Sequence, residues 1–194
     1  MTIQDNAKKI NSLNFYFMGF WISTVIGLLG FSTGIALAVM TRAGQIAGVG
    51  TIAQIAMFMG LVAMIAALVF GAALLYQLWK LIPSDIARTT PGKAVGLCLI
   101  PFFGFYWIFV AFYGLGKDMN ETLRQHELSY QVNESLGLIY CILMCMTLIP
   151  RQDFFTQMLF LSSCLISCIV VIFFFKSVKN GAIAILEQVS EPQS

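Results

Sequence analysis

Three long apolar runs constrain what this chain can fold into more than any other feature. They cover residues 15–40, 52–79 and 154–176, and no Asp, Glu, Lys or Arg interrupts them before Lys176. An α-helix needs about 20 apolar residues to cross a hydrocarbon core of about 30 Å. A content of 59% hydrophobic and 10% charged residues points the same way. We therefore expect an all-α polytopic membrane protein, with the first run as a retained signal anchor.

Two further apolar segments leave the number of crossings open. Residues 136–149 are short for a crossing and are expected to borrow a turn from residues 132–135, which gives a span of about 133–149. In residues 94–116, Pro101 breaks a helix and Gly104 allows a reversal, so neither apolar arm is long enough to cross alone. The segment is either a re-entrant hairpin, giving four crossings, or a Pro-kinked fifth span.

The distribution of basic residues favours the hairpin. With five crossings the 11 Lys and Arg residues divide six against five, which is no bias, whereas four crossings give nine against two. The positive-inside rule then puts both termini in the cytoplasm. We expect a cytoplasmic tail at 1–13, one membrane domain at 14–187 and a flexible tail at 188–194. The nine are Lys8, Lys9, Lys80, Arg88, Lys93, Lys117, Arg124, Lys176 and Lys179, and the two are Arg42 and Arg151.

Small residues recur at helical spacing on the first two spans. Such stripes let two helix backbones approach closely. We expect the two stripes to pack against each other, with a homodimer face as the alternative. The residues are Gly30 and Gly34 on the first span and Gly60, Ala63, Ala67 and Gly71 on the second.

The polar segments suggest two surface features. Arg88 and Lys93 precede or begin the hairpin and are candidates for a lipid phosphate, although they also serve as ordinary topology-setting charges. Residues 117–135 could form an amphipathic helix that lies on the membrane, meets a partner, or simply continues the hairpin arm. Lys117 and Glu121 are spaced as an i,i+4 pair.

The tip of the hairpin has its own expectation. Irregular backbone at membrane depth is tolerated only against protein or a water-filled cavity, so the four helices should enclose it. Enclosed residues there could act as an apolar constriction. These residues are Pro101, Phe102, Phe103 and Gly104.

The sequence offers little catalytic chemistry. No charged residue lies deep in a proposed span, there is one histidine, and no phosphate-binding, metalloprotease or serine-hydrolase motif is present. Thiols suit Cu(I) or another thiophilic metal, but they also pack as small apolar groups, which we favour. We expect no enzyme activity, cofactor, metal or nucleic-acid partner. The thiols in the last two spans are Cys141, Cys145, Cys164 and Cys168.

The block from 90 to 120 carries a resemblance. It reads TPGKAVG, then IPFF, then YW, and the stretch from about residue 76 to 120 resembles a family of uncharacterised bacterial multi-pass membrane proteins. That family implies four helices around such a block and a bacterial cytoplasmic membrane, without an activity. Members often have asparagine where this chain has Gly104.

These observations predict a non-enzymatic accessory or scaffold subunit of the membrane. It would associate with itself or with a larger complex. A channel or small-solute conduit, with the Pro101 tip as its constriction, is the alternative.

Overall fold

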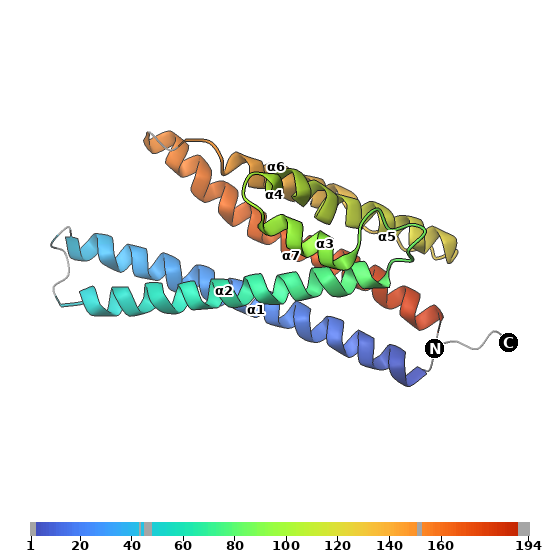
Figure 1. Ribbon diagram of the computed structural model, residues 1–194. Helices are drawn as coiled ribbons and strands as arrows, with labels where there is room; N and C mark the ends of the chain where they lie inside the picture. Colours follow the sequence, from blue (N-terminus) through green and yellow to red (C-terminus); the bar gives the residue numbers. More distant parts are fainter. Residues whose placement is uncertain (1–2, 43, 45–47, 151–152, 190–194) are drawn as a thin grey trace. The chain divides into compact units, whose positions relative to one another are not determined.

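The regular secondary structure of the described residues is entirely helical (Figure 1). The computed structural model describes residues 3–42, 44, 48–150 and 153–189. Three helices are long and apolar enough to cross a membrane: α1 (Ile3–Arg42), α2 (Gly50–Leu81) and α7 (Phe154–Gln188). Helix α6 (Glu134–Met146) is apolar but has only 13 residues. The expectation of an all-α chain with the helices of a membrane protein is confirmed at this level.

The ends of two long helices extend beyond the predicted spans. Residues 3–13 of the segment predicted as a cytoplasmic tail are helical and continue α1 without a break. The reason is a tertiary contact, because the buried side-chain amide of Asn6 donates to the Leu186 carbonyl at 3.1 Å. Lys179 also donates to the Asn14 side chain at 2.8 Å. Helix α7 therefore runs to Gln188, and residues 190–194 of the predicted tail lie outside the described residues.

The chain divides into two compact units. One contains residues 15–73, and the other contains residues 1–14 and 74–194. In the first unit, α1 and α2 pack through their small residues. A Cβ added to Gly30 would lie 3.1 Å from the Gly60 Cα, and one added to Gly34 would lie 3.0 Å from the Ala53 carbonyl oxygen. The predicted packing of the two stripes against each other is found within one chain, so these residues are covered and do not form a free face for a second copy.

The remaining members of the α2 stripe lie on the same buried side. Ala67 is buried, Gly71 lies beneath the Phe20 ring, and Ala63 is half-buried. The other faces carry large exposed apolar side chains, such as Leu29 and Phe58. This division is typical of a helix pair surrounded by lipid.

The core of the second unit is built around α7. Phe112 lies 4.7 Å from Tyr140 and 5.7 Å from Phe175, measured between ring centroids, and Phe174 completes the cluster. Each such aromatic pair contributes about 0.5–1.5 kcal/mol beyond its buried area. Helix α6 thereby packs against α7 and against the hairpin that precedes it.

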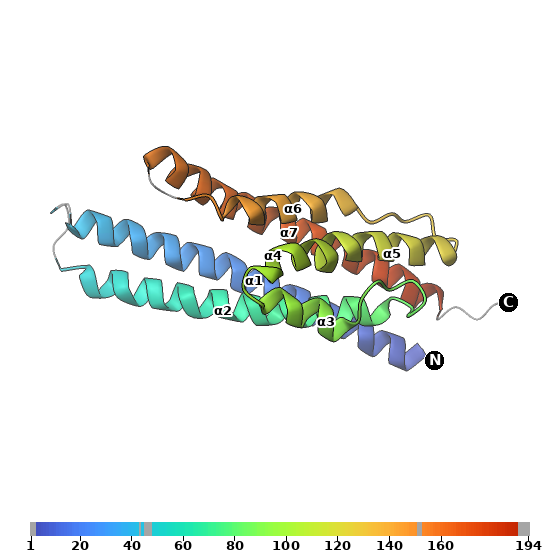
Figure 2. The same ribbon diagram turned by 45° about the horizontal axis from the view of Figure 1, so that its top comes forward.

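Residues 91–125 form a hairpin and not a kinked span. Its first arm is α3 (Pro91–Gly96) with a 3₁₀ turn, η1 (Leu97–Leu99). The chain reverses, and the second arm runs unbroken through α4 (Phe103–Ile108), the π-helical η2 (Phe109–Tyr113) and α5 (Gly114–Gln125). Figure 2 shows the two arms running back from the loop that joins α3 to α4.

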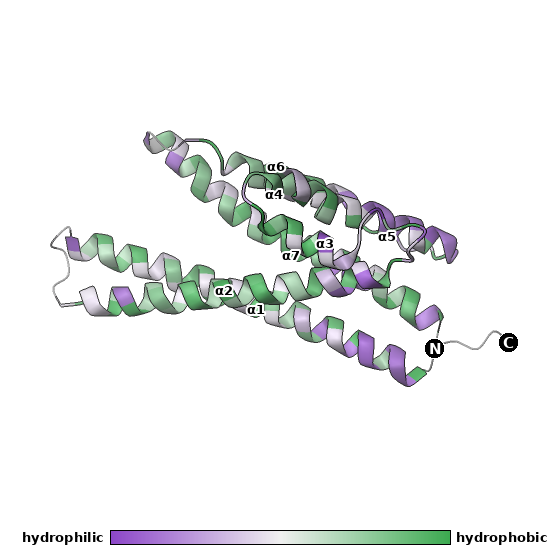
Figure 3. Cartoon of the chain, in the orientation of Figure 1, coloured by the Kyte–Doolittle hydropathy of each residue, from purple (hydrophilic) through white to green (hydrophobic). Residues whose placement is uncertain are grey.

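Several polar segments meet at one end of this second unit, which we call the polar end. It comprises the first turns of α1, loop 82–90, residues 117–133 and the last turns of α7. Gln188 donates to the His126 carbonyl at 2.9 Å, and the Asn6 contact with Leu186 joins the two termini of the fold. Hydrophilic residues gather on α5 and on the start of α1 (Figure 3). The base of the hairpin lies at this end as well.

Candidate functional site

The hairpin reverses through a tight turn centred on Phe102. Its backbone has φ 62° and ψ −50°, and the Phe103 N–H donates to the Pro101 carbonyl at 2.7 Å. This is a γ-turn of the rare, strained form with positive φ. The Gly104 N–H donates to the Ile100 carbonyl at 2.7 Å, and a Cβ on Gly104 would lie 2.5 Å from the Cys98 carbonyl oxygen. Glycine is therefore required at 104 in this turn.

The tip carries an exposed apolar surface. Phe102 is 90% exposed, Leu99 is 69% exposed and Tyr106 is 64% exposed. Pro101, Phe102 and Phe103 are all exposed, while Gly104 is buried against the first arm. Within their own unit, α6 and α7 do not cover the tip, and enclosure of the tip by all four helices stays a prediction.

Two tryptophans fix the hairpin at its base. The Trp107 indole N–H donates to the Lys93 carbonyl at 2.9 Å and joins the two arms. The Trp79 indole N–H donates to the Ala111 carbonyl at 3.1 Å and joins the second arm to α2. Trp79 is 1% exposed, and its acceptor belongs to the π-helical turn η2, a kind of irregularity that often occurs at functional sites.

An ion pair joins loop 82–90 to the second arm. The Arg88 guanidinium Nε lies 2.7 Å from one Asp118 carboxylate oxygen, and the Arg88 backbone N–H donates to the other at 3.0 Å. The Asp118 side chain is 3% exposed and that of Arg88 is 48% exposed. Sequence reasoning missed Asp118; its only signal is a carboxylate placed where the apolar arm becomes polar.

The predicted pair between Lys117 and Glu121 is not formed. Glu121 instead accepts from Arg124, one turn closer to the helix end, at 2.8 Å. Lys117 places its ammonium 4.7 Å from the centroid of the Tyr113 ring, in the range of a cation–π contact. Both residues of the predicted pair therefore contact other neighbours: Glu121 contacts Arg124, and Lys117 contacts Tyr113.

The apolar face of α5 is already covered within the chain. Leu115, Met119 and Leu123 are at most 1% exposed. The His126 side chain caps the helix through its contact with the Thr122 carbonyl at 2.8 Å, and the Tyr130 hydroxyl donates to the Ser177 carbonyl at 3.1 Å. Of the three alternatives for residues 117–135, continuation of the hairpin arm is the one observed. That face is not free for a membrane surface or a partner.

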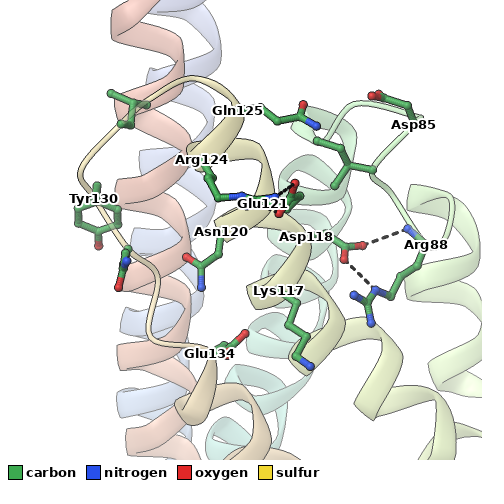
Figure 4. Close-up of a pocket in the computed structure, with 13 residues that line it drawn as sticks. Asp85, Arg88, Lys117, Asp118, Asn120, Glu121, Arg124, Gln125, Tyr130 and Glu134 are labelled. Atoms are coloured by element: carbon green, nitrogen blue, oxygen red, sulfur yellow. Dashed lines mark hydrogen bonds and ion pairs between the residues drawn. The ribbon is translucent and has the colours of Figure 1, made fainter.

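A broad polar groove of about 710 Å³ lies over α5 (Figure 4). Its walls come from loop 82–90, α5 and the connection to α6. Four acidic and three basic side chains line it, so their fields largely cancel and the groove does not favour one sign of ligand charge. The charged residues lining it are Asp85, Arg88, Lys117, Asp118, Glu121, Arg124 and Glu134.

The four cysteines of α6 and α7 are buried or partly buried. Cys141 is buried and its thiol donates to the Ile108 carbonyl at 3.5 Å, while Cys145, Cys164 and Cys168 are partly buried. Within the described ranges, no three His, Cys, Asp or Glu residues group so as to hold a metal ion.

The two residues expected near a lipid phosphate lie together beside the hairpin base. Arg88 and Lys93 both line a second cavity, next to Trp107.

In comparisons with protein-family models, curated proteins and solved structures, none matches this chain.

Proposed function

We propose that this chain is a non-enzymatic membrane subunit that associates through its hairpin tip with a second copy of itself or with another membrane protein. The observation that carries the proposal is Phe102, a bulky aromatic residue held at φ 62° and 90% exposed. A residue with a Cβ in such a conformation costs about 1–3 kcal/mol, which glycine would avoid. A contact outside the isolated chain offsets this cost.

The depth of the tip supports the same proposal. From Pro91, α3 and η1 rise roughly 15 Å, or about half of a 30 Å hydrocarbon core. Acyl chains offer no hydrogen bonds to a non-helical turn, so such backbone is covered by protein or water. A partner helix packed on the tip supplies that cover.

The proposal includes four crossings with both termini in the cytoplasm. The hairpin would re-enter from the cytoplasmic face of a bacterial membrane and return to it. Support comes from the polar end, because the basic residues of loop 82–90, α5 and the last turns of α7 gather there, and cytoplasmic loops carry such an excess. The exposed side chains of the tip are apolar, which favours binding of another protein over catalysis.

The test replaces Phe102 with a photoreactive phenylalanine derivative and irradiates intact membranes. The matched control carries the same derivative at Ile169, which is 56% exposed on α7 and far in sequence from the hairpin. We expect a protein adduct of discrete mass from position 102 only. An adduct at twice the mass of the chain identifies a second copy, and any other discrete mass identifies a different protein.

Two results would contradict the proposal. One is a set of lipid adducts alone at both positions, which would place the tip in contact with acyl chains. The other is the same protein adduct with the same yield at both positions, which would reflect random collision.

A further inference from the structure

A second cavity at the hairpin base differs from the polar groove in the sign of its charge. It has a volume of about 450 Å³, within the range of small-ligand sites, and lies between Trp79 and Trp107. Its charged lining residues are Lys80, Arg88 and Lys93, and no carboxylate lines it. Arg88 is paired with Asp118, which lies outside the cavity, whereas Lys80 and Lys93 have no carboxylate beside them in its lining. The wall therefore keeps a positive excess, which attracts anions.

The cavity also presents hydroxyl groups. Ser84, Thr89 and Thr90 line it beside the basic side chains. The Thr89 hydroxyl oxygen is shielded from solvent and makes no hydrogen bond within the described chain. Buried polar atoms without a partner are uncommon in folded proteins, and such an atom often marks the place where an ion or a ligand binds.

Arg88 is positioned to serve both the fold and a ligand. Asp118 engages the Nε–H and the backbone N–H of Arg88. The two terminal guanidinium nitrogens have no protein partner among the described residues, and the side chain is 48% exposed. A guanidinium held by its Nε presents its remaining N–H groups in a planar fork that matches two phosphate oxygens.

We propose that this cavity binds a phosphate group of net negative charge. Lys80, Arg88 and Lys93 neutralise the charge, and Thr89 donates to a phosphate oxygen. Lysine and arginine side chains next to an apolar segment are typical of sites for an anionic lipid headgroup at the membrane–water interface. An aqueous phosphate could reach the same groups from the cytoplasm. This site stands apart from the hairpin tip, so it does not depend on the association proposed above.

The experiment measures binding to the full chain, delipidated in detergent and carrying Trp21→Phe. The fluorescence of Trp79 and Trp107 then reports only on the cavity walls. Three probes are titrated: short-chain phosphatidylglycerol, short-chain phosphatidylcholine and inorganic phosphate. The test variants are Lys80→Gln with Lys93→Gln, and separately Thr89→Val. The matched control is Lys117→Gln with Arg124→Gln, which removes two charges from the polar groove instead.

We expect phosphatidylglycerol to bind and phosphatidylcholine to bind far more weakly. Each lysine removed should weaken binding about 5-fold, as for basic residues near an anionic surface. The control should stay within about twofold of the parent chain. Binding of phosphatidylglycerol without inorganic phosphate assigns the site to a lipid headgroup. Binding of both, with the same dependence on the lysines, assigns it to phosphate in general.

Three results would overturn the proposal. They are equal binding of phosphatidylcholine and phosphatidylglycerol, unchanged binding in the double-lysine variant, and an equal loss in the control. Thr89→Val separates a loss of binding from a loss of folding, because valine keeps the shape and charge of threonine and lacks only the hydroxyl. This variant should bind more weakly while its melting temperature stays that of the parent chain. Unchanged binding in this variant would remove Thr89 from the site.

Discussion

Asp118 accepts two hydrogen bonds from a single residue, one from the Arg88 backbone N–H and one from its guanidinium, across 30 positions of sequence. The Asp118 carboxylate is buried and so depends on the two Arg88 donors for its charge to be tolerated. Loop 82–90 is thereby fixed against the second arm of the hairpin.

The first prediction is that Asp118→Asn destabilises the protein. The amide keeps the shape but loses the charge, and at least one of the two bonds to Arg88 weakens. A loss of about 1–3 kcal/mol is expected for hydrogen bonds to a charged group. The melting temperature in detergent should fall by several degrees.

Glu121→Gln is the control for this change. It removes the same charge from the same helix, but its Arg124 partner is largely exposed, and exposed pairs contribute about 0–1 kcal/mol. Equal melting temperatures for the two variants would show that the Asp118 contact adds nothing beyond a surface ion pair.

The second prediction concerns the α1–α2 contact. A Cβ on Gly60 would lie 2.9 Å from the Phe31 Cα, so Gly60→Ala forces the two backbones apart. Overpacking of this kind costs about 1–3 kcal/mol and exceeds the gain in helix propensity. The melting temperature should fall. In Gly50→Ala the added methyl group meets nothing within 4 Å, so stability should be unchanged or higher. The idea fails if both variants are neutral.

The parts of this fold that could be predicted from sequence are those set by local chemistry. Pro101 and Gly104 allow a reversal, the distribution of basic residues favours it over a kinked span, and the small residues of the first two spans indicate their packing. The helical start of α1 could not be predicted, because its polar residues are ordered by Leu186 and Lys179, more than 160 positions away. The Arg88–Asp118 pair was missed for the same reason, since it exists only once the hairpin closes. The exposure of Phe102 was not predicted. The rule that irregular backbone in a membrane is covered by protein does not specify whether the covering protein is the same chain or another one.

The third prediction is a pH dependence at the start of α7. Hydrogen bonds from the Thr156 side chain and then from its backbone N–H hold the pKa of the Asp153 carboxyl below its ordinary value of 3.8. Because the pKa is lowered in the folded state, this stabilisation is present above pH 3.8 and is lost as the pH falls through the folded pKa. The protection of amides in the first turn of α7, measured as the exchange rate relative to the intrinsic rate at the same pH, should fall over that window. In Asp153→Ala the protection should be low at every pH, and equal protection in the parent chain above and below the window would refute the cap.

The fourth prediction separates Gly104 from the other glycines of the hairpin. In Gly104→Ala the added methyl group meets the Cys98 carbonyl oxygen, so the tight turn opens. The Trp107 bond to Lys93 should weaken, and the emission of Trp107 should shift in a background lacking the other two tryptophans. Gly96→Ala, whose methyl group meets nothing within 4 Å, is the matched control and should leave the emission unchanged. Identical spectra for the two variants would mean that the turn does not require glycine at 104.

The fifth prediction separates two effects of Phe102: its positive φ lowers stability, and its exposed ring makes the proposed contact with a partner. Phe102→Gly and Phe102→Ala both remove the ring, but only glycine relieves the positive φ. Both variants should therefore lose the protein adduct, formed in this case from a photoreactive group at Leu99, while only Phe102→Gly should gain stability, by about 1 kcal/mol. Thermal melting of the two variants in detergent measures the second effect. Adduct formation that survives in both would separate the ring from association, and equal melting temperatures would mean that the turn carries no strain. A gain in stability with a loss of association is the pattern expected of a conformation retained for its partner.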